Sequence, residues 1–106
     1  MVTYDDFIKL DLRVATVLDV EDHPDADRLY VLRIEVGEEK KQIVAGVKAS
    51  YAPEELMGKK IVIVNNLEPA VIRGQESSGM LLAASSDGTP VVITPEKDIP
   101  SGARIK

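Results

Sequence analysis

The feature that most restricts the fold of this sequence is a series of short segments with apolar residues at every second position. This period indicates β-strands that bury one face, because successive side chains of a strand point to opposite sides. The predicted strands cover residues 12–20, 29–36, 41–47, 59–67 and 80–84. One face of the first strand is expected to carry Leu12, Val14, Thr16, Leu18 and Val20. No long helices separate the strands, which excludes the dinucleotide-binding α/β fold.

Two short helices are predicted, one before the first strand and one between the third and the fourth. Thr3 and Asp6 have the spacing of a capping box, so a helix should begin after Thr3. Val2 precedes this cap and can pack on Phe7, which fixes the direction of the incoming chain. In the second segment, residues 50–58, an early proline is followed by two glutamates and finally by a glycine.

The order of these elements is typical of one known architecture. Five strands, a small helix after the third, and long loops between strands one and two and between strands four and five are typical of the OB-fold. We therefore expect an all-β, five-stranded OB-fold barrel that forms a single domain over residues 1–106, with further short strands near the C-terminus. In that fold the two long loops, residues 21–27 and 68–79, usually belong to the binding surface.

Composition narrows the classes of function. The formal net charge of -5 counts against nucleic acid as a partner, although a local basic patch can still act over about 8 Å in physiological salt. There is no cysteine, hence no disulfide, thiol nucleophile or thiolate metal site. No apolar run approaches the roughly 20 residues of a membrane helix, and the N-terminus lacks the pattern of a signal peptide. We expect a cytoplasmic protein without a membrane partner.

The residues that could carry catalysis or metal binding are few. His23, Asp25 and Asp27 lie in one loop and could hold a hard cation, but a proline-fixed turn whose carboxylates accept backbone amides explains them better. His23 is the single histidine, and no glycine-rich phosphate-binding motif occurs, so a nucleophile with its base, or ATP binding, has no support. We expect no catalytic residues, no metal and no cofactor.

The loop between the fourth and fifth predicted strands is rich in neutral donors around one guanidinium. Three Tyr, one Phe and no Trp leave little for stacking against unpaired bases, the usual way that OB-folds bind single strands. Neutral donors and an arginine suit phosphate and ribose contacts on a folded RNA, but an ordinary solvated loop explains them equally well. The residues concerned are Asn65, Asn66, Arg73, Gln75, Ser77 and Ser78.

Three separated motifs, in order, give the sequence a specific resemblance that spans nearly the whole chain. HPDADRLYVLRIEVGE, PEELMGKKIVIVNNLEPAVIRGQESSGMLLAA and PSGARI resemble the tRNA-binding domain family. That family includes the C-terminal domain or separate β subunit of methionyl-tRNA synthetase and a free-standing structure-specific tRNA-binding protein. It also includes the cytokine-like tails of eukaryotic synthetase complexes and an insert in the phenylalanyl-tRNA synthetase β chain.

The resemblance implies how the molecule would be used. It implies a homodimer in which the C-terminal part, residues 80–106, packs against its twofold mate, and which embraces the outer corner of tRNA without reading the anticodon. The apolar strands of that segment favour the same association. Glu68 and Val71 depart from the family pattern, because lysines often stand there. By the same resemblance, the tRNA-binding residues are Arg28, Asn66, Arg73, Ser77 and Met80.

The function expected from the sequence is therefore non-catalytic, shape-specific tRNA binding that assists an aminoacyl-tRNA synthetase. The β subunit or tRNA-binding domain of methionyl-tRNA synthetase fits best, and the catalytic subunit of that enzyme is a possible partner. Because Met1 almost directly precedes the barrel, we expect a stand-alone subunit. Two alternatives stay open: a chaperone-like peptide-binding dimer of the same fold, and a module that docks a synthetase without touching RNA. A hydrolase on a barrel scaffold is disfavoured by the missing histidine and cysteine pairs.

Overall fold

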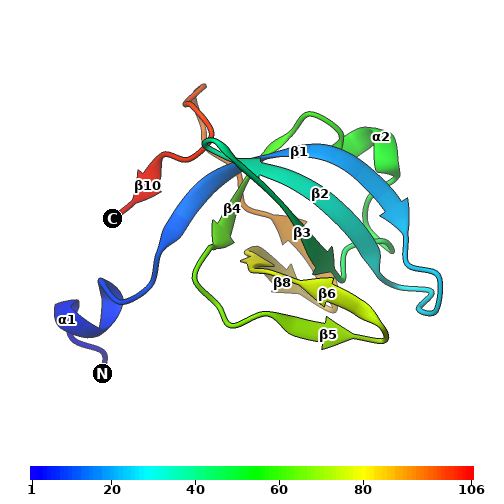
Figure 1. Cartoon of the computed structure of the whole chain (residues 1–106), viewed down its shortest axis with the longest axis horizontal. Coiled ribbons are helices and arrows are strands. Elements are labelled where there is room, and N and C mark those ends of the chain that lie inside the picture. The colour runs from blue at the N-terminus through cyan, green and yellow to red at the C-terminus, as the bar shows by residue number, and fades with distance from the viewer.

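The computed structural model describes residues 1–106 as a strongly curled sheet with two small hairpins and two helices of one turn each (Figure 1). The elements, in chain order, are α1 (Tyr4–Phe7), β1 (Leu12–Asp22), β2 (Tyr30–Val36), β3 (Glu39–Ala45), α2 (Pro53–Leu56), β4 (Lys60–Val64), β5 (Ala70–Ile72), β6 (Gln75–Ser77), β7 (Met80–Leu81), β8 (Ala83–Ser86), β9 (Thr89–Val92) and β10 (Arg104–Ile105).

The main sheet has the strand order β3-β2-β1-β4-β7, with β10 added to β1, and all of its pairs are antiparallel. The long strand β1 pairs with β2 along one half and with β4 along the other, so the sheet bends around it. The hairpins β5–β6 and β8–β9 form separate two-stranded sheets. The predicted fold class is confirmed: the protein is an all-β, OB-like barrel with a short helix between its third and fourth strands.

The core fills the inside of the curled sheet. Fully buried aliphatic side chains come from β2, β3 and β4, and Leu56 of α2 joins them at 0% exposure. Burying such a side chain contributes roughly 1.5 to 3 kcal/mol, so a one-turn helix with one leucine suffices to cover an end of the barrel. The Tyr30 hydroxyl donates to the Tyr51 carbonyl oxygen at 2.6 Å, and Val92 N donates to the Tyr51 hydroxyl at 3.0 Å. These bonds join β2 to β9 through Tyr51, which lies just before α2.

A β-bulge in β1 overturns the expectation of one regular face from Leu12 to Val20. Val17 pairs with Ile34 and Asp19 with Arg33, which leaves Leu18 without a partner and 39% exposed. An extra residue reverses the alternation, so the core receives Val17 before the bulge and Val20 after it. Val14 is buried instead on the opposite side, beneath the C-terminal segment.

Two other predictions about strands also need correction. The predicted strand 80–84 is two strands, because β7 pairs with β4 while β8 turns away after Leu82 to pair with β9. The loop 68–79, expected to be irregular, contains the hairpin β5–β6. No ladder joins β3 to β7, and the barrel is closed between them by the bond from Ser78 N to the Gln42 carbonyl oxygen, 2.9 Å long.

Residues 101–103 of the C-terminal segment, here called the strap, cross β1 and are held by several hydrogen bonds. Gly102 N donates to the Val14 carbonyl oxygen at 2.7 Å, and Val14 N donates to that of Ala103 at 2.9 Å. Ser101 Oγ accepts from Gly37 N at 2.9 Å, in the turn between β2 and β3. The strap therefore joins the end of the chain to β1 and to the turn between β2 and β3.

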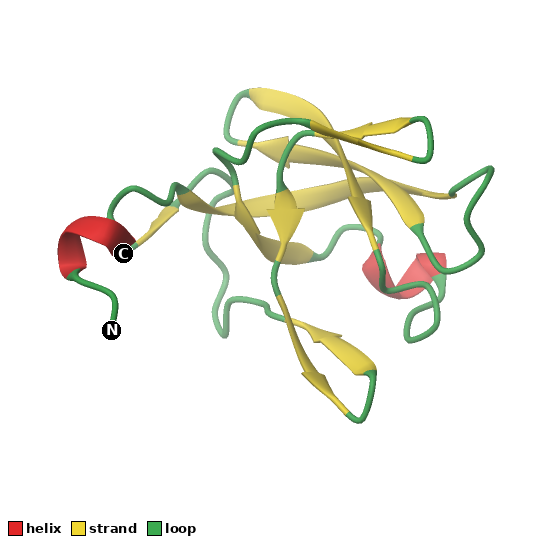
Figure 2. Cartoon of the chain, turned by 90° about the horizontal axis from the view of Figure 1, so that it is seen from below, coloured by secondary structure: helices red, strands yellow, loops and turns green.

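The two termini lie at one end of the molecule, and α2 lies at the other (Figure 1, Figure 2). The predicted capping box is present, since the Thr3 hydroxyl accepts from Asp6 N and the Asp6 carboxylate accepts from Thr3 N. No residue of α1 is buried, and apolar side chains of α1, the segment after it and β10 line a shallow depression. Neither helix is long or apolar enough to cross a membrane.

Candidate functional site

The β5–β6 hairpin projects an arginine from its tip. Ile72 pairs with Gln75, so the turn consists of Arg73 and Gly74, with φ angles of 48° and 88°. Two successive positive φ angles are those of a type I′ turn, the connection that matches the twist of a hairpin. Arg73 is exposed, and its Nη1 donates to the Asp25 carbonyl oxygen at 3.1 Å. Since a guanidinium has five N–H donors, most of them remain free for a ligand.

The loop between β1 and β2 carries the second predicted arginine and is closed on itself. His23 N donates to the Leu29 carbonyl oxygen at 3.1 Å, which brings the two ends of the loop together. Arg28 is exposed near the second of these ends. The bond from Arg73 to Asp25 therefore joins the hairpin tip to the loop that presents Arg28.

His23 is buried at the junction of loop and hairpin, with 4% of its surface exposed. Its Nδ1 lies 2.9 Å from Asp25 N, and its Nε2 lies 2.9 Å from the Ile72 carbonyl oxygen. Both ring nitrogens are thus engaged inside the protein. The loop turns as expected, but the acceptor of the Asp25 amide is the His23 ring and not a carboxylate. Local sequence around His23 carries no signal that this ring reaches β5.

The base of the hairpin is held on β3 by side chains, Ser77 among them. Gln42 Nε2 donates to the Glu76 carbonyl oxygen at 3.0 Å. Ser77 Oγ accepts from Val44 N at 2.9 Å and donates to the Gly79 carbonyl oxygen at 3.0 Å. Ser77 is 5% exposed, so its hydroxyl positions the hairpin instead of pointing outwards. An edge amide of β3, which the broken ladder would leave unpaired, is satisfied in this way.

Asn66 and its neighbour hold the opposite end of β4. Asn66 Oδ1 accepts from Asp11 N at 2.9 Å, and its Nδ2 donates to the Lys9 carbonyl oxygen at 2.8 Å. Asn65 Nδ2 donates to the Asp11 carboxylate at 3.1 Å. Arg13 Nε lies 2.6 Å from an oxygen of the same carboxylate. The hydrogen bond from Asn65, aided by Arg13, lowers the pKa of Asp11 below its ordinary value. Asn66 thereby anchors the segment between α1 and β1.

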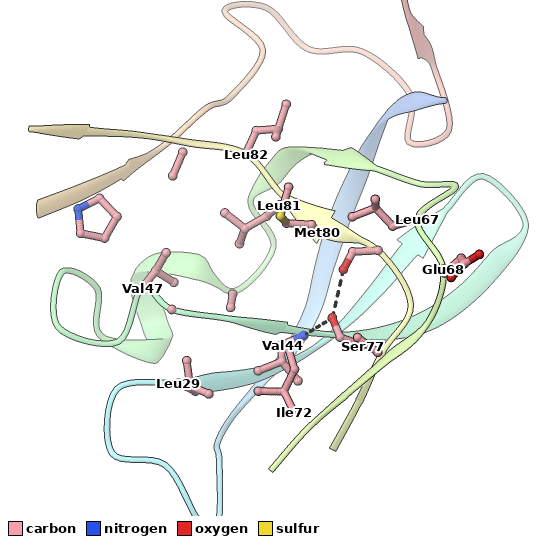
Figure 3. Close-up of a pocket in the computed structure, with 16 residues that line it drawn as sticks. Leu29, Val44, Val47, Leu67, Glu68, Ile72, Ser77, Met80, Leu81 and Leu82 are labelled. Carbon is pink, nitrogen blue, oxygen red and sulfur yellow. Dashed lines mark hydrogen bonds between the residues drawn. The ribbon is translucent and has the colours of Figure 1, made fainter. Parts of the chain in front are cut away.

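A mostly apolar groove of about 540 Å³ lies beside the hairpin, lined by residues of β3, the hairpin, β7 and the segment before β5 (Figure 3). Leu29, Val44 and Ile72 form one part of its lining, and Leu67, Met80 and Leu81 form another. Met80 is 48% exposed, and the exposed Glu68 lies among the lining residues. The groove opens beside the same hairpin that carries Arg73.

The five predicted residues therefore fall into two groups. Arg28, Arg73 and Met80 expose their side chains around the hairpin, whereas Ser77 and Asn66 are engaged in internal bonds. Carboxylates stand on the same segments, so the surface has mixed charge and is not a basic patch. The exposed acidic residues of the loop and the hairpin region are Asp25, Asp27, Glu68 and Glu76.

Comparison with known proteins identifies relatives over nearly the whole chain. The family model described as "Putative tRNA binding domain" matches residues 12–104. A methionine–tRNA ligase of Thermococcus kodakarensis is 51% identical over 105 residues, which are 99% of this chain and 14% of that protein. The chain thus spans about one seventh of the length of that relative.

Solved structures share the fold over their full length. A MetRS-related protein of Pyrococcus horikoshii superimposes with a TM-score of 0.94 at 34% identity, covering 100% of this chain and 98% of that one. The chaperone CsaA of Bacillus anthracis gives a TM-score of 0.91 at 34% identity, covering 100% of this chain and 99% of that one.

Proposed function

Because this chain belongs to the tRNA-binding domain family, we propose that it binds folded tRNA without catalysing a reaction. The proposed surface consists of the β1–β2 loop, the β5–β6 hairpin and the groove edge beside them. Arg28 and Arg73 contact phosphates there, and Met80 packs against a sugar or base. Ser77 acts from within, by holding the hairpin on β3, whereas Asn66 anchors the segment between α1 and β1.

The observation that carries the proposal is the way in which Arg73 is presented. A non-glycine residue at positive φ is uncommon, and here it places the guanidinium at the tip of a hairpin. One nitrogen is fixed to the Asp25 carbonyl oxygen, which orients the remaining donors at little entropic cost on binding. Arginine donors in a fixed plane suit bidentate contacts with phosphate oxygens.

The aromatic side chains favour recognition of shape over recognition of unpaired bases. Tyr30 is buried, and Tyr51 is half-buried with its hydroxyl bonded to Val92 N. The exposed Tyr4 lies apart from the hairpin, in α1 at the end that holds the termini (Figure 1). Neither of the two tyrosines near the barrel offers a face on which successive bases could stack, which is the usual device for single-stranded RNA. Contacts to phosphates and ribose hydroxyls at a fixed spacing instead select a folded RNA.

Binding of folded tRNA and of an unstructured RNA of equal length, measured by fluorescence anisotropy at several salt concentrations, tests the proposal. The tRNA should bind more tightly, and Arg73→Ala should weaken its binding by about 1 to 3 kcal/mol. Arg73→Lys has the same positive-φ requirement and keeps the charge, so it serves as the matched control and should lose less. Equal affinity for both RNAs, or an unchanged affinity of Arg73→Ala, would count against this surface.

We further propose that the protein assists an aminoacyl-tRNA synthetase, with methionyl-tRNA synthetase as the first candidate. The support is the 51% identity to one region of a methionine–tRNA ligase, of which this chain matches 14%. The protein, added in trans, should lower the tRNA concentration needed for half-maximal aminoacylation by the catalytic part of that enzyme. If the wild-type protein binds tRNA but leaves this tRNA concentration unchanged, a role apart from the synthetase would be favoured.

A homodimer is proposed as the working form. Apolar residues of α1, the segment after it and β10 gather at the terminal end of the molecule, with Tyr4, Ile8 and Leu10 exposed, and residues 80–106 add β10 to this terminal patch. The patch consists of Tyr4, Phe7, Ile8, Leu10 and Ile105. Burial of such a patch in a symmetric interface would stabilise α1, which contributes nothing to the core.

Analytical ultracentrifugation at micromolar concentration tests the dimer. Wild-type protein should sediment as a dimer, and Ile8→Asp should shift it to a monomer. Leu18→Asp is the matched control, since Leu18 is similarly exposed but lies at the bulge of β1. A monomeric wild type would refute the dimer.

The groove of about 540 Å³ supports a second candidate, peptide binding of a chaperone-like kind. Its lining is largely aliphatic, and a similar solved structure is described as a chaperone. A denatured model polypeptide should then bind and compete with tRNA, because the groove adjoins the hairpin of Arg73. RNA-independent docking on a synthetase, the other alternative, predicts binding of neither ligand.

A further inference from the structure

His23 has two hydrogen-bond partners of opposite character, and these define the tautomer of its ring. A backbone amide can only donate, so Nδ1 accepts from Asp25 N and carries no proton. A carbonyl oxygen can only accept, so Nε2 carries the proton and donates to Ile72. The ring is therefore a neutral bridge with one end in the β1–β2 loop and the other on β5.

The hairpin β5–β6 has few other means of keeping its tip against that loop. It forms no ladder with the main sheet, and its base is held on β3 through Gln42 and Ser77. At the tip, the loop contacts are the bond from His23 to Ile72 and the bond from Arg73 to Asp25. The first of these two bonds is part-buried and the second is exposed, so the first is less open to competition from water.

We propose that His23 is a positioning residue for the tRNA surface, through its Nε2 bond to the Ile72 carbonyl oxygen. That bond fixes the spacing between Arg73 on the hairpin and Arg28 on the loop. The inference rests on the proposed function, but its structural part concerns the protein alone. Two arginines at a fixed separation match two phosphates, whereas a hinged hairpin would lose entropy on binding.

Two substitutions separate the two ends of the imidazole. His23→Asn places Oδ1 near the position of Nδ1, so it can still accept from Asp25 N but cannot reach Ile72. His23→Gln places an Nε2 donor near that of the ring, so it can reach Ile72 but leaves Asp25 N without its acceptor. Each variant loses one bond, so a merely structural role of His23 would weaken both in the same way.

The first measurement needs no RNA. The chain contains no cysteine, so Asp27→Cys and Val71→Cys introduce one pair of exposed spin-label sites per chain, one on the loop and one on β5, and an excess of unlabelled protein removes distances between the chains of a dimer. Double electron–electron resonance should give a narrow distance distribution for the His23 protein and for His23→Gln. The distribution should broaden in His23→Asn. Equal widths in both variants would overturn the inference, whether or not the protein binds tRNA.

The second measurement is the affinity for folded tRNA, with unlabelled proteins. His23→Asn should bind about two- to tenfold more weakly, the range that one net hydrogen bond supplies, and His23→Gln should bind nearly as well as wild type. If both variants bind alike while only His23→Asn broadens the distances, the positioning of the two arginines does not matter for tRNA and the inference fails. Failure of the wild type to bind any tRNA would refute the proposed function instead.

Discussion

Replacement of Gly102 by alanine should be among the most damaging small changes to this protein. Gly102 has φ near 89°, and an added Cβ would lie 2.7 Å from Gly37 Cα and 2.8 Å from Gly37 N. Both neighbours are backbone atoms, so no flexible side chain can move aside. The turn between β2 and β3 and the C-terminal strap would have to separate.

The magnitude follows from two contributions. A residue with a side chain in left-handed backbone costs about 1 to 2 kcal/mol, and overpacking in a filled contact costs about 1 to 3 kcal/mol. Together they lower the free energy of unfolding by about 2 to 5 kcal/mol, out of the roughly 5 to 15 kcal/mol typical of a domain. With a slope of about 1.5 kcal/mol per molar urea, the unfolding midpoint should fall by roughly 1 to 3 M.

Gly88→Ala separates the two contributions. Gly88 has φ near 78° in the turn between β8 and β9, but no other atom lies within 4 Å of its Cβ position. That variant should lose only the backbone contribution, about 1 to 2 kcal/mol. Urea unfolding followed by circular dichroism measures both. If Gly102→Ala is no less stable than Gly88→Ala, the close approach of strap and turn does not hold in solution and the reasoning is wrong.

Three further predictions concern charge, acid and the core. Glu68→Lys should strengthen tRNA binding by about tenfold at low salt, with a smaller gain at high salt, because it removes a repulsion and adds an attraction. Glu96→Lys, beside a different depression, makes the same change in net charge and should gain less; equal gains would exclude the hairpin region as the tRNA face. The lowered pKa of Asp11 adds stability that is present above pH 3.8 and lost as the pH falls through the folded value, so urea unfolding of Asp11→Asn should depend less on pH in that range. Leu56→Ala should lower the free energy of unfolding by about 2 to 5 kcal/mol in the same assay. An unchanged unfolding midpoint would show that α2 is dispensable for the core.

The parts of the fold that were predictable from the sequence are those determined by neighbouring residues. The capping box of Thr3 and Asp6 and the short helix predicted within residues 50–58 depend on residues close in the chain. The OB-like architecture followed from the succession of alternating segments along the chain and from the position of one short helix. The bulge at Leu18 depends on pairing with a distant strand, and alternation within β1 alone gave no indication of it.

The hairpin β5–β6 was missed although the sequence carried a signal for it. Two residues, Arg73 and Gly74, separate AVI from QES, and glycine at the second position of a two-residue connection is common in type I′ turns. Arginine at the first position weakens the signal, because such turns prefer asparagine, aspartate or glycine there. The strained position of Arg73 is thus a feature that local preference would have argued against, as is frequent where a residue serves binding.

Some polar loop residues that were expected to contact a ligand are used instead by the fold itself. The broken ladder beside β3 leaves the amide of Val44 in need of an acceptor, and Ser77 supplies it. Asn66 serves the backbone of Asp11 and Lys9 in the same manner. Neither need can be recognised before the strands are paired in space, so a polar side chain in a loop looks like a free donor in the sequence.

These internal bonds bear on how a protein with a net charge of -5 can bind a polyanion at all. The two exposed arginines of the proposed surface stand among several carboxylates, so long-range attraction contributes little and the salt dependence of binding should be shallow. Affinity must then come from contacts whose geometry is fixed before the RNA arrives, because side chains and loops that are ordered on binding lose part of the interaction energy. The bonds of His23, Gln42 and Ser77 reduce that loss by holding the hairpin in place. A surface of this kind favours an RNA whose phosphates are themselves held at fixed positions, as in a folded tRNA, over a flexible strand of the same charge.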